Sequence, residues 1–154
     1  MKILIDADGC PVVDITVQEA ARYHIETVIL CDTSHWIQRE GARTITVSKG
    51  ADSVDFTLVN LVCAGDLVIT QDYGLAAMCL ARRAVPIHQN GFVYDDRNID
   101  ALLSARHVSR EIRRAGGRTK GPSKLKPQEN ERFQKTLRRC ILAGLGGQGP
   151  VSAP

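Results

Sequence analysis

The sequence has no apolar run approaching the roughly 18–20 residues that a membrane-spanning helix needs, which argues against an α-helical membrane protein. Its opening, Met-Lys-Ile-Leu-Ile-Asp, reads as a strand rather than as a basic segment followed by an apolar one, so no signal peptide is indicated. We therefore expect a cytoplasmic protein without membrane contacts.

Aromatic residues are scarce, at 5% of the chain, and Phe133 is the only one between residues 106 and 139, where basic residues gather. Proteins that hold single-stranded bases usually stack them on aromatic rings, so base stacking is a poor candidate for recognition here. Contacts to nucleic-acid phosphates need no aromatic side chain and stay open.

Disulfide frameworks and zinc sites are not indicated either. The five cysteines, at positions 10, 31, 63, 79 and 140, are odd in number and contain no Cys-x-x-Cys pair. Cys10 precedes an expected helix and could be a nucleophile, but nearby carboxylates would raise its pKa and no histidine adjoins it in sequence. We expect reduced, mostly buried thiols.

The 154 residues suit one domain, which we place at residues 1–142, with the Gly-rich segment 143–154 as a disordered tail. Charge is divided along the chain. Residues 1–105 carry 8 basic and 14 acidic side chains, a balance of −6, whereas residues 106–139 carry 12 basic and 3 acidic ones, a balance of +9. A solvated face would explain the basic part, but the asymmetry favours a polyanionic partner.

Apolar spacing predicts an alternation of strands and helices. Strands are expected at 3–5, 25–30, 43–47, 66–70 and 84–88, and helices at 12–23, 52–64, 75–83, 98–115 and 128–142. In the fourth helix the expected inward residues are Ile99, Leu102, Leu103, Val108 and Ile112. This alternation is typical of an α/β fold with a mostly parallel sheet and helices on both faces.

Carboxylates follow two of these strands. Asp6 and Asp8 end the first strand two positions apart, so they share a face if the extended geometry persists, and Asp72 follows the fourth strand. Ligands of parallel sheets bind beyond the carboxyl ends of the strands. Asp52 and Asp55, three apart on a helix, share a face as well.

Clustered carboxylates repel one another unless a cation lies between them, and a hard ion such as Mg²⁺ or Mn²⁺ prefers oxygen ligands. Each acid also has a structural explanation. Asp8 could cap the helix that follows it, and Asp52 and Asp55 lie in a first turn, where the helix dipole favours negative charge.

Four segments of the chain carry a family resemblance. They are Asp-Ala-Asp-Gly-Cys-Pro-Val at 6–12, Gly-Ala-Asp-Ser-Val-Asp at 50–55, Gly-Asp-Leu-Val-Ile-Thr-Gln-Asp-Tyr-Gly-Leu-Ala at 65–76, and Asn98-Ile99. Together they resemble the bacterial YaiI/YqxD family, which is placed among the PIN-like domains. The resemblance covers residues 2–137. It implies a three-layer Rossmann-like fold with strand order 3-2-1-4-5.

The same resemblance implies a site at which PIN-like nucleases hold divalent metal for phosphodiester hydrolysis. By position, Asp6, Asp8 and Asp72 would be catalytic, and the metal ligands would be Asp6, Asp8, Asp52, Asp55 and Asp72, with Mg²⁺ or Mn²⁺ as cofactor. The partner would be nucleic acid, RNA in preference to DNA. Its phosphates would be contacted by the basic stretch, with Arg113, Arg114, Arg118 and Lys120 as candidates.

Two other functions compete with the nuclease. A non-catalytic nucleic-acid-binding protein could use the acids for structural metal or for none. A phosphatase of the haloacid dehalogenase type would use Asp6 as nucleophile and Asp8 as general acid and base. That family also needs a hydroxyl, a lysine and a later acidic pair, and the available residues, Thr70, Arg82 or Arg83, and Asp95 with Asp96, are poor substitutes.

Overall fold

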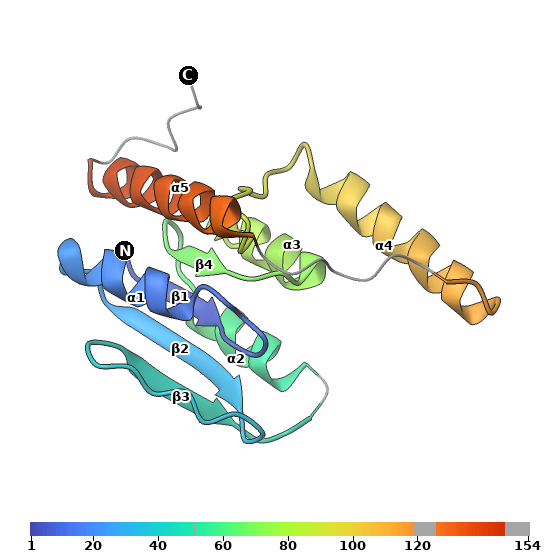
Figure 1. The fold of residues 1–154 in the computed structure, drawn as a ribbon, viewed down its shortest axis with the longest axis horizontal. Coiled ribbons are helices and arrows are strands. Elements are labelled where there is room, and N and C mark those ends of the chain that lie inside the picture. Colours follow the sequence, from blue (N-terminus) through green and yellow to red (C-terminus); the bar gives the residue numbers. More distant parts are fainter. Residues whose placement is uncertain (51, 119–125, 147–154) are drawn as a thin grey trace.

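The structure, a computed structural model, describes residues 1–50, 52–118 and 126–146. In chain order its elements are β1 (Ile3–Asp6), α1 (Val13–Arg22), β2 (Thr27–Asp32), β3 (Arg43–Val47), α2 (Ser53–Leu61), β4 (Leu67–Ile69), α3 (Tyr73–Ala81), β5 (Val85–Ile87), α4 (Ile99–Arg114) and α5 (Pro127–Leu145). Each expected strand and helix is present, with ends that differ by a few residues (Figure 1).

The five strands form one sheet in the order β3-β2-β1-β4-β5, and every neighbouring pair is parallel. This confirms the α/β fold, the parallel sheet and the strand order. β1 lies at the centre, with Ile5 opposite Ile29 of β2 on one side and Ile69 of β4 on the other. The carboxyl ends of β1, β2 and β4 consequently lie side by side at one edge of the sheet.

Alternating side chains of the strands build two cores. Ile3 and Ile5 face α1 and α5, where they join Phe133 and Leu137, while Leu4 faces α2 and α3. The helices thus cover both faces of the sheet, as the three-layer fold requires. Because the central strands are buried on both sides, their sequences are continuous apolar runs instead of alternating ones.

α5 is joined to α1 by a buried acid. The Glu19 carboxylate, 1% exposed, accepts hydrogen bonds from the Arg138 guanidinium at 2.8 and 3.2 Å and from the Gln134 amide at 2.7 Å. These partners, Arg138 first, lower the pKa of Glu19, so the carboxylate stays ionised inside the fold. Arg138 therefore has a structural role as the partner of Glu19, which makes it a poor candidate for binding nucleic-acid phosphate.

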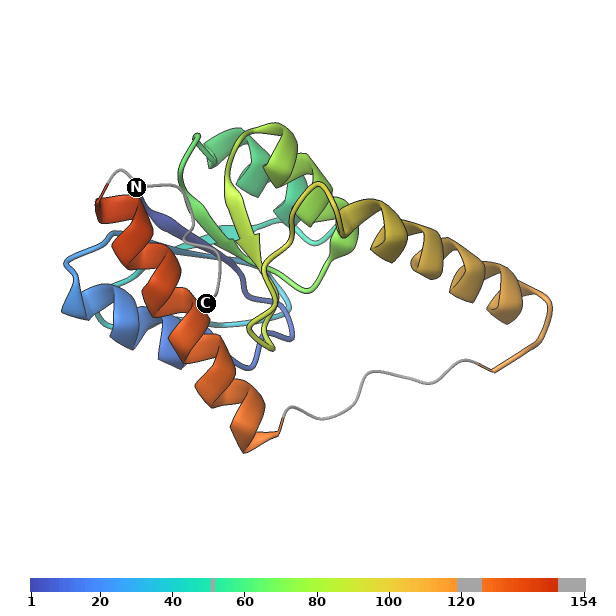
Figure 2. The same ribbon diagram turned by 90° about the horizontal axis from the view of Figure 1, so that it is seen from above.

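α4 contradicts part of the sequence prediction. Ile99 is buried, and Leu102 and Leu103 pack beside it against α3, but Val108 is 55% and Ile112 43% exposed. Both lie on the side of the helix opposite Ile99, and Figure 2 shows that the second half of α4 extends beyond the rest of the domain and has no layer to pack against. Burial therefore ends about halfway along this helix.

The C-terminal part also differs from the prediction. α5 continues to Leu145, so residues 143–145 belong to a helix and not to the tail, whereas 147–154 lie outside the described residues. The basic stretch 106–139 is divided between α4 and α5, two helices that occupy separate positions (Figure 2). Across the part of the chain that the structure describes, no helix combines the length and apolar character needed to cross a membrane.

Candidate functional site

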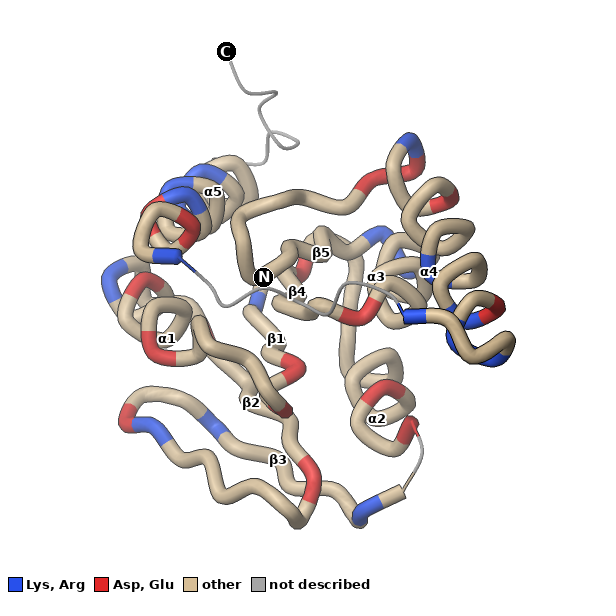
Figure 3. The backbone as a smooth tube through the Cα atoms, turned by 45° about the vertical axis from the view of Figure 1, so that its right-hand side comes forward, with Lys and Arg blue, Asp and Glu red and all other residues tan. Residues whose placement is uncertain are grey.

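A cleft of about 520 Å³ opens at the carboxyl ends of the central strands. Its lining residues are Asp6, Asp8, Asp32, Gly50, Asp52, Ser53, Val54, Asp55, Gln71, Asp72, Tyr73 and Arg106. Figure 3 shows acidic positions at or just after the ends of β1, β2 and β4 and on α2. Six aspartates and one arginine thus share one hollow.

All five aspartates predicted from the sequence line this cleft, which confirms that they converge. The fold explains the meeting, because β1 and β4 are neighbours and α2 packs over β1 and β2. Asp6 is the last residue of β1, Asp72 precedes α3, and Asp52 and Asp55 lie at the start of α2. That the acids bind metal remains a prediction.

Thr70 connects two of the acids. Its hydroxyl donates to Asp6 Oδ2 at 2.8 Å and accepts from the Asp72 backbone N–H at 3.0 Å. The hydroxyl therefore fixes the orientation of the Asp6 carboxylate and the start of the turn that carries Asp72. Tyr94, almost fully buried, donates its own hydroxyl to the Thr70 carbonyl at 3.3 Å and supports the same turn.

Asp72 has two structural duties in addition to its place in the cleft. Its Oδ1 caps α3 by accepting from the backbone N–H of Gly74 at 2.8 Å and of Leu75 at 3.2 Å. The same oxygen lies 3.0 Å from Nη1 of Arg106, which comes from α4. A helix cap fixes a carboxylate without consuming its second oxygen, so capping and ligand binding are compatible here.

The start of α2 lacks the side-chain cap that Asp72 provides for α3. Asp52 occupies the capping position with a backbone φ of 61°, in the left-handed region, and its side chain makes no capping hydrogen bond. Both Asp52 and Asp55 belong to the cleft lining instead. Helix capping therefore does not account for the Asp52 side chain.

Two acids of the cleft, Asp6 and Asp55, have raised pKa values. Burial, followed by the negative charges of Asp55, Asp72 and Asp8, raises the pKa of Asp6 to about 6, against the effect of the Thr70 hydrogen bond. Burial and the charges of Asp72 and Asp52 raise the pKa of Asp55 to about 6, although Arg106 opposes the shift. The cleft thus carries more negative charge than its own residues neutralise.

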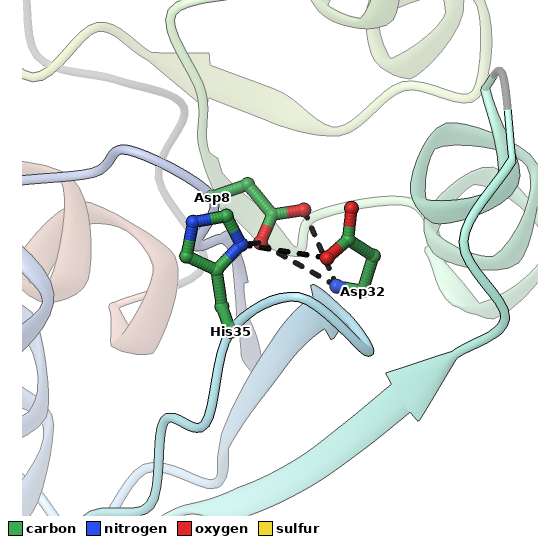
Figure 4. A group of neighbouring side chains, drawn as sticks. All are labelled: Asp8, Asp32 and His35. Atoms are coloured by element: carbon green, nitrogen blue, oxygen red, sulfur yellow. Dashed lines mark hydrogen bonds and ion pairs between the residues drawn. The ribbon is translucent and has the colours of Figure 1, made fainter.

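Three site residues escaped the sequence prediction: Asp32, at the end of β2, His35, just after it, and Arg106, on α4. His35 Nδ1 lies 2.9 Å from Asp8 Oδ1 and 3.4 Å from Asp32 Oδ1 (Figure 4). Asp32 ends β2 as Asp6 ends β1, so the rule that strand ends carry the site could have found it. One ligand atom from each of Asp8, Asp32 and His35 lies within 4.8 Å of the other two.

A model of the family described as "Uncharacterized BCR, YaiI/YqxD family" matches residues 4–143. The chain belongs to this family. It is 55% identical to a UPF0178 protein of Exiguobacterium sibiricum over 92% of this chain and 96% of the relative. A UPF0178 protein of Ruminiclostridium cellulolyticum is 49% identical over 89% and 90% of the two chains, and one of Clostridium acetobutylicum 44% over 94% and 99%. No solved structure matches significantly.

The basic candidates of this YaiI/YqxD chain lie apart from the acids. Arg113, Arg114 and Arg118 are exposed and do not line the cleft, while Lys120 lies outside the described residues. Among the residues that the structure describes, the arginine that reaches the cleft is Arg106, which was not singled out from the sequence. Only the packing of α4 on α3 brings it there.

The rival catalytic groups of this YaiI/YqxD protein find no support. Burial raises the pKa of Cys10 to about 11, so its thiol stays protonated and a poor nucleophile. Arg82, Arg83, Asp95 and Asp96, the residues a haloacid dehalogenase mechanism would need, do not line the cleft.

Proposed function

We propose that this protein is a divalent-metal-dependent nuclease that hydrolyses phosphodiester bonds, in RNA in preference to DNA. The observation that carries the proposal is the meeting of six aspartates and Arg106 in one cleft at the carboxyl edge of a parallel sheet. A phosphodiester is an anion, so six carboxylates repel it unless cations intervene. The arrangement suits a metal ion that is held by the carboxylates and binds a phosphate oxygen of the substrate.

The donor set fits Mg²⁺ or Mn²⁺. Asp6, Asp8, Asp52, Asp55 and Asp72 all offer oxygen ligands to the cleft. Asp6 and Asp55 have raised pKa values because burial and unbalanced negative charge act on them, and a cation relieves the second of these. When bound, such an ion supplies charge neutralisation at the phosphate and lowers the pKa of a water molecule.

The chain's own residues then have separate roles. Arg106, at the cleft wall, is placed to pair with a phosphate oxygen, since a guanidinium forms charge-assisted hydrogen bonds with phosphate. Hydrolysis adds the oxygen of water to phosphorus and breaks the bond to the leaving oxygen. A carboxylate of the cleft accepts the proton of the attacking water, and the leaving oxygen takes up a proton.

The test is cleavage of labelled RNA and DNA, each single-stranded and duplex, with Mg²⁺, with Mn²⁺ and with EDTA. We expect metal-dependent shortening of single-stranded RNA and none in EDTA. Binding without cleavage in every metal would identify a non-catalytic nucleic-acid-binding protein instead. A phosphoenzyme on Asp6, trapped with a small phosphate ester, would identify the phosphatase.

His35 leads to a prediction about metal preference. Imidazole binds Mn²⁺ better than Mg²⁺, and the distances from His35 Nδ1 to Asp8 Oδ1 and Asp32 Oδ1, 2.9 and 3.4 Å, suit neighbouring ligands at about 2 Å from one metal ion. His35→Gln is therefore expected to weaken Mn²⁺ binding roughly tenfold and Mg²⁺ binding little, as measured by electron paramagnetic resonance of free Mn²⁺ and by calorimetry.

His24→Asn is the matched control for that measurement, because His24 is exposed, lies before β2 at the opposite edge of the sheet, and has a positive φ that asparagine tolerates. Equal weakening of Mn²⁺ and Mg²⁺ by His35→Gln would show that the imidazole is not a ligand.

A further inference from the structure

The face that α4 turns toward the domain changes character along its length. In the first half this face holds Ile99, Leu102 and Leu103, which pack against the domain. Continuing at the same spacing of three or four residues, the face next presents Arg106, Arg110, Arg113 and Arg114, which we call the arginine row. An apolar packing stripe therefore becomes a basic stripe where the helix leaves the body (Figure 2).

The arginine row is continuous with the acidic cleft. Arg106, its first member, lines the cleft and pairs with Asp72, whereas Arg110, Arg113 and Arg114 are exposed. With a rise of 1.5 Å per residue, the row extends about 12 Å from Arg106 to Arg114. Of the acids of α4, Asp100 lies in the first turn, away from the exposed arginines, and Glu111 borders the row beside Arg114.

Local stabilisation accounts for only part of this pattern. Arg113 and Arg114 lie in the last turn, where positive charge is favoured by the helix dipole, and Arg114 forms an exposed pair with Glu111 at 3.5 Å. Arg110 lies before that turn and has no ion pair within the described chain. Surface ion pairs also give no reason for the exposed arginines to lie on the same face of α4 as Arg106, which lines the cleft.

We propose that the arginine row holds the phosphates of one single strand of nucleic acid and leads it into the acidic cleft, a proposal that rests on the proposed nuclease function. A single row of guanidinium groups matches the phosphates of one strand. The cleft, at about 520 Å³, has the size of a site for a small ligand, which suits a nucleotide or two and not a duplex. The substrate is thus a single strand that extends past the site of cleavage along α4.

A second basic surface, on α5, is the alternative binding surface for the strand. Arg132, Lys135 and Arg139, spaced on one face of α5, line another hollow together with Gly91. This surface has as many basic side chains as the exposed part of the arginine row, beside one acid, Glu131, but none of its residues lines the acidic cleft. Binding that depends on charge alone would use either surface, whereas the proposal requires α4.

The experiment measures binding of fluorescent oligouridylates of about 4, 8 and 16 nucleotides by anisotropy in Mg²⁺, so that cations are available to the cleft, and the strands carry nuclease-resistant phosphorothioate linkages so that none is cut. The first variant combines Arg110→Gln, Arg113→Gln and Arg114→Gln. The control combines Arg132→Gln, Lys135→Gln and Arg139→Gln, which removes the same charge from α5. A third variant with lysine at 110, 113 and 114 keeps the charge, and circular dichroism checks that each protein is folded.

We expect the α4 glutamine variant to bind the longest strand roughly ten- to a hundredfold more weakly and to lose about 2 from the slope of log affinity against log salt concentration. It should bind the shortest strand nearly as the parent does, because a short strand occupies mainly the cleft. The lysine variant should retain most of the affinity, and the α5 control should change little.

A folded α4 variant with parental affinity, a larger loss in the α5 control, or tighter binding of a duplex of equal length would each overturn the proposal. These outcomes are distinct from failure of the nuclease function. Binding that depends on α4 without cleavage in any metal would reject the nuclease and leave the strand path intact.

Discussion

Asp6→Asn is expected to reduce metal-dependent cleavage by roughly a hundredfold or more and to leave the fold intact, since loss of one group that stabilises a transition state costs about 10²- to 10³-fold in rate. Asp6 lies in the cleft at the end of the middle strand, and burial, followed by the charges of three other acids, raises its pKa. Asparagine keeps an oxygen that accepts the Thr70 hydrogen bond, so the geometry survives while the negative charge is lost.

The measurement is the initial rate of RNA shortening at saturating Mn²⁺, with melting curves recorded in EDTA and in Mn²⁺. Asp14→Asn is the control, because Asp14 is an exposed carboxylate of α1 outside the cleft. The metal-induced rise in melting temperature should shrink in Asp6→Asn and persist in the control, since a ligand stabilises the state that binds it. If Asp6→Asn cleaved RNA at the parental rate, the cleft would not be the site of catalysis.

The same substitution should stabilise the metal-free protein, and increasingly so as the pH rises. Asp6 has a folded-state pKa of about 6 and an ordinary value of 3.8, so between these values the folded protein holds a proton that the unfolded chain has released. Stability therefore falls with rising pH across this window, and the fall is complete above the folded-state pKa. The asparagine variant has no such penalty, and its gain is about 1 kcal/mol at about pH 4.5 and about 3 kcal/mol at about pH 7.5.

Urea unfolding of parent and variant at both pH values, in EDTA, measures this difference. Titrating groups outside the cleft, among them Glu19 and His88, are common to both proteins and cancel. Asp55→Asn should act in the same direction, because burial and neighbouring carboxylates raise its pKa as well. A stability difference that does not change with pH would show that Asp6 is not held under electrostatic strain.

The sequence was informative where local pattern and sheet topology act together. Short apolar runs that lead into an aspartate located the strand ends, and parallel pairing places such ends at a common edge whatever the loops do. This is why Asp6 and Asp72, 66 positions apart, could be assigned to one site. Asp52 and Asp55 were assigned to the same site only through the family resemblance, because the spacing of α2 does not say where this helix lies relative to the sheet.

Pattern alone was misleading for α4. Val108 and Ile112 are four apart, as two residues of one stripe would be, but Val108 follows Leu103 by five residues and so lies on the opposite side of the helix from Ile99. The face that packs is defined by Ile99, Leu102 and Leu103, and its continuation holds arginine. Which face a helix buries depends on the layer beside it, and that layer ends before Val108.

The sequence by itself determined the α/β class, the central strands and the acids at their ends, because side-chain periodicity and chain connectivity are local properties that any parallel sheet converts into one carboxyl edge. Only the tertiary structure decided that His35 turns back to Asp8 and Asp32, that Arg106 reaches Asp72 from a helix 34 positions later, and that the basic residues divide between two helices. These are contacts between side chains brought together by packing, and packing depends on the relative placement of whole elements, which no spacing along the chain encodes.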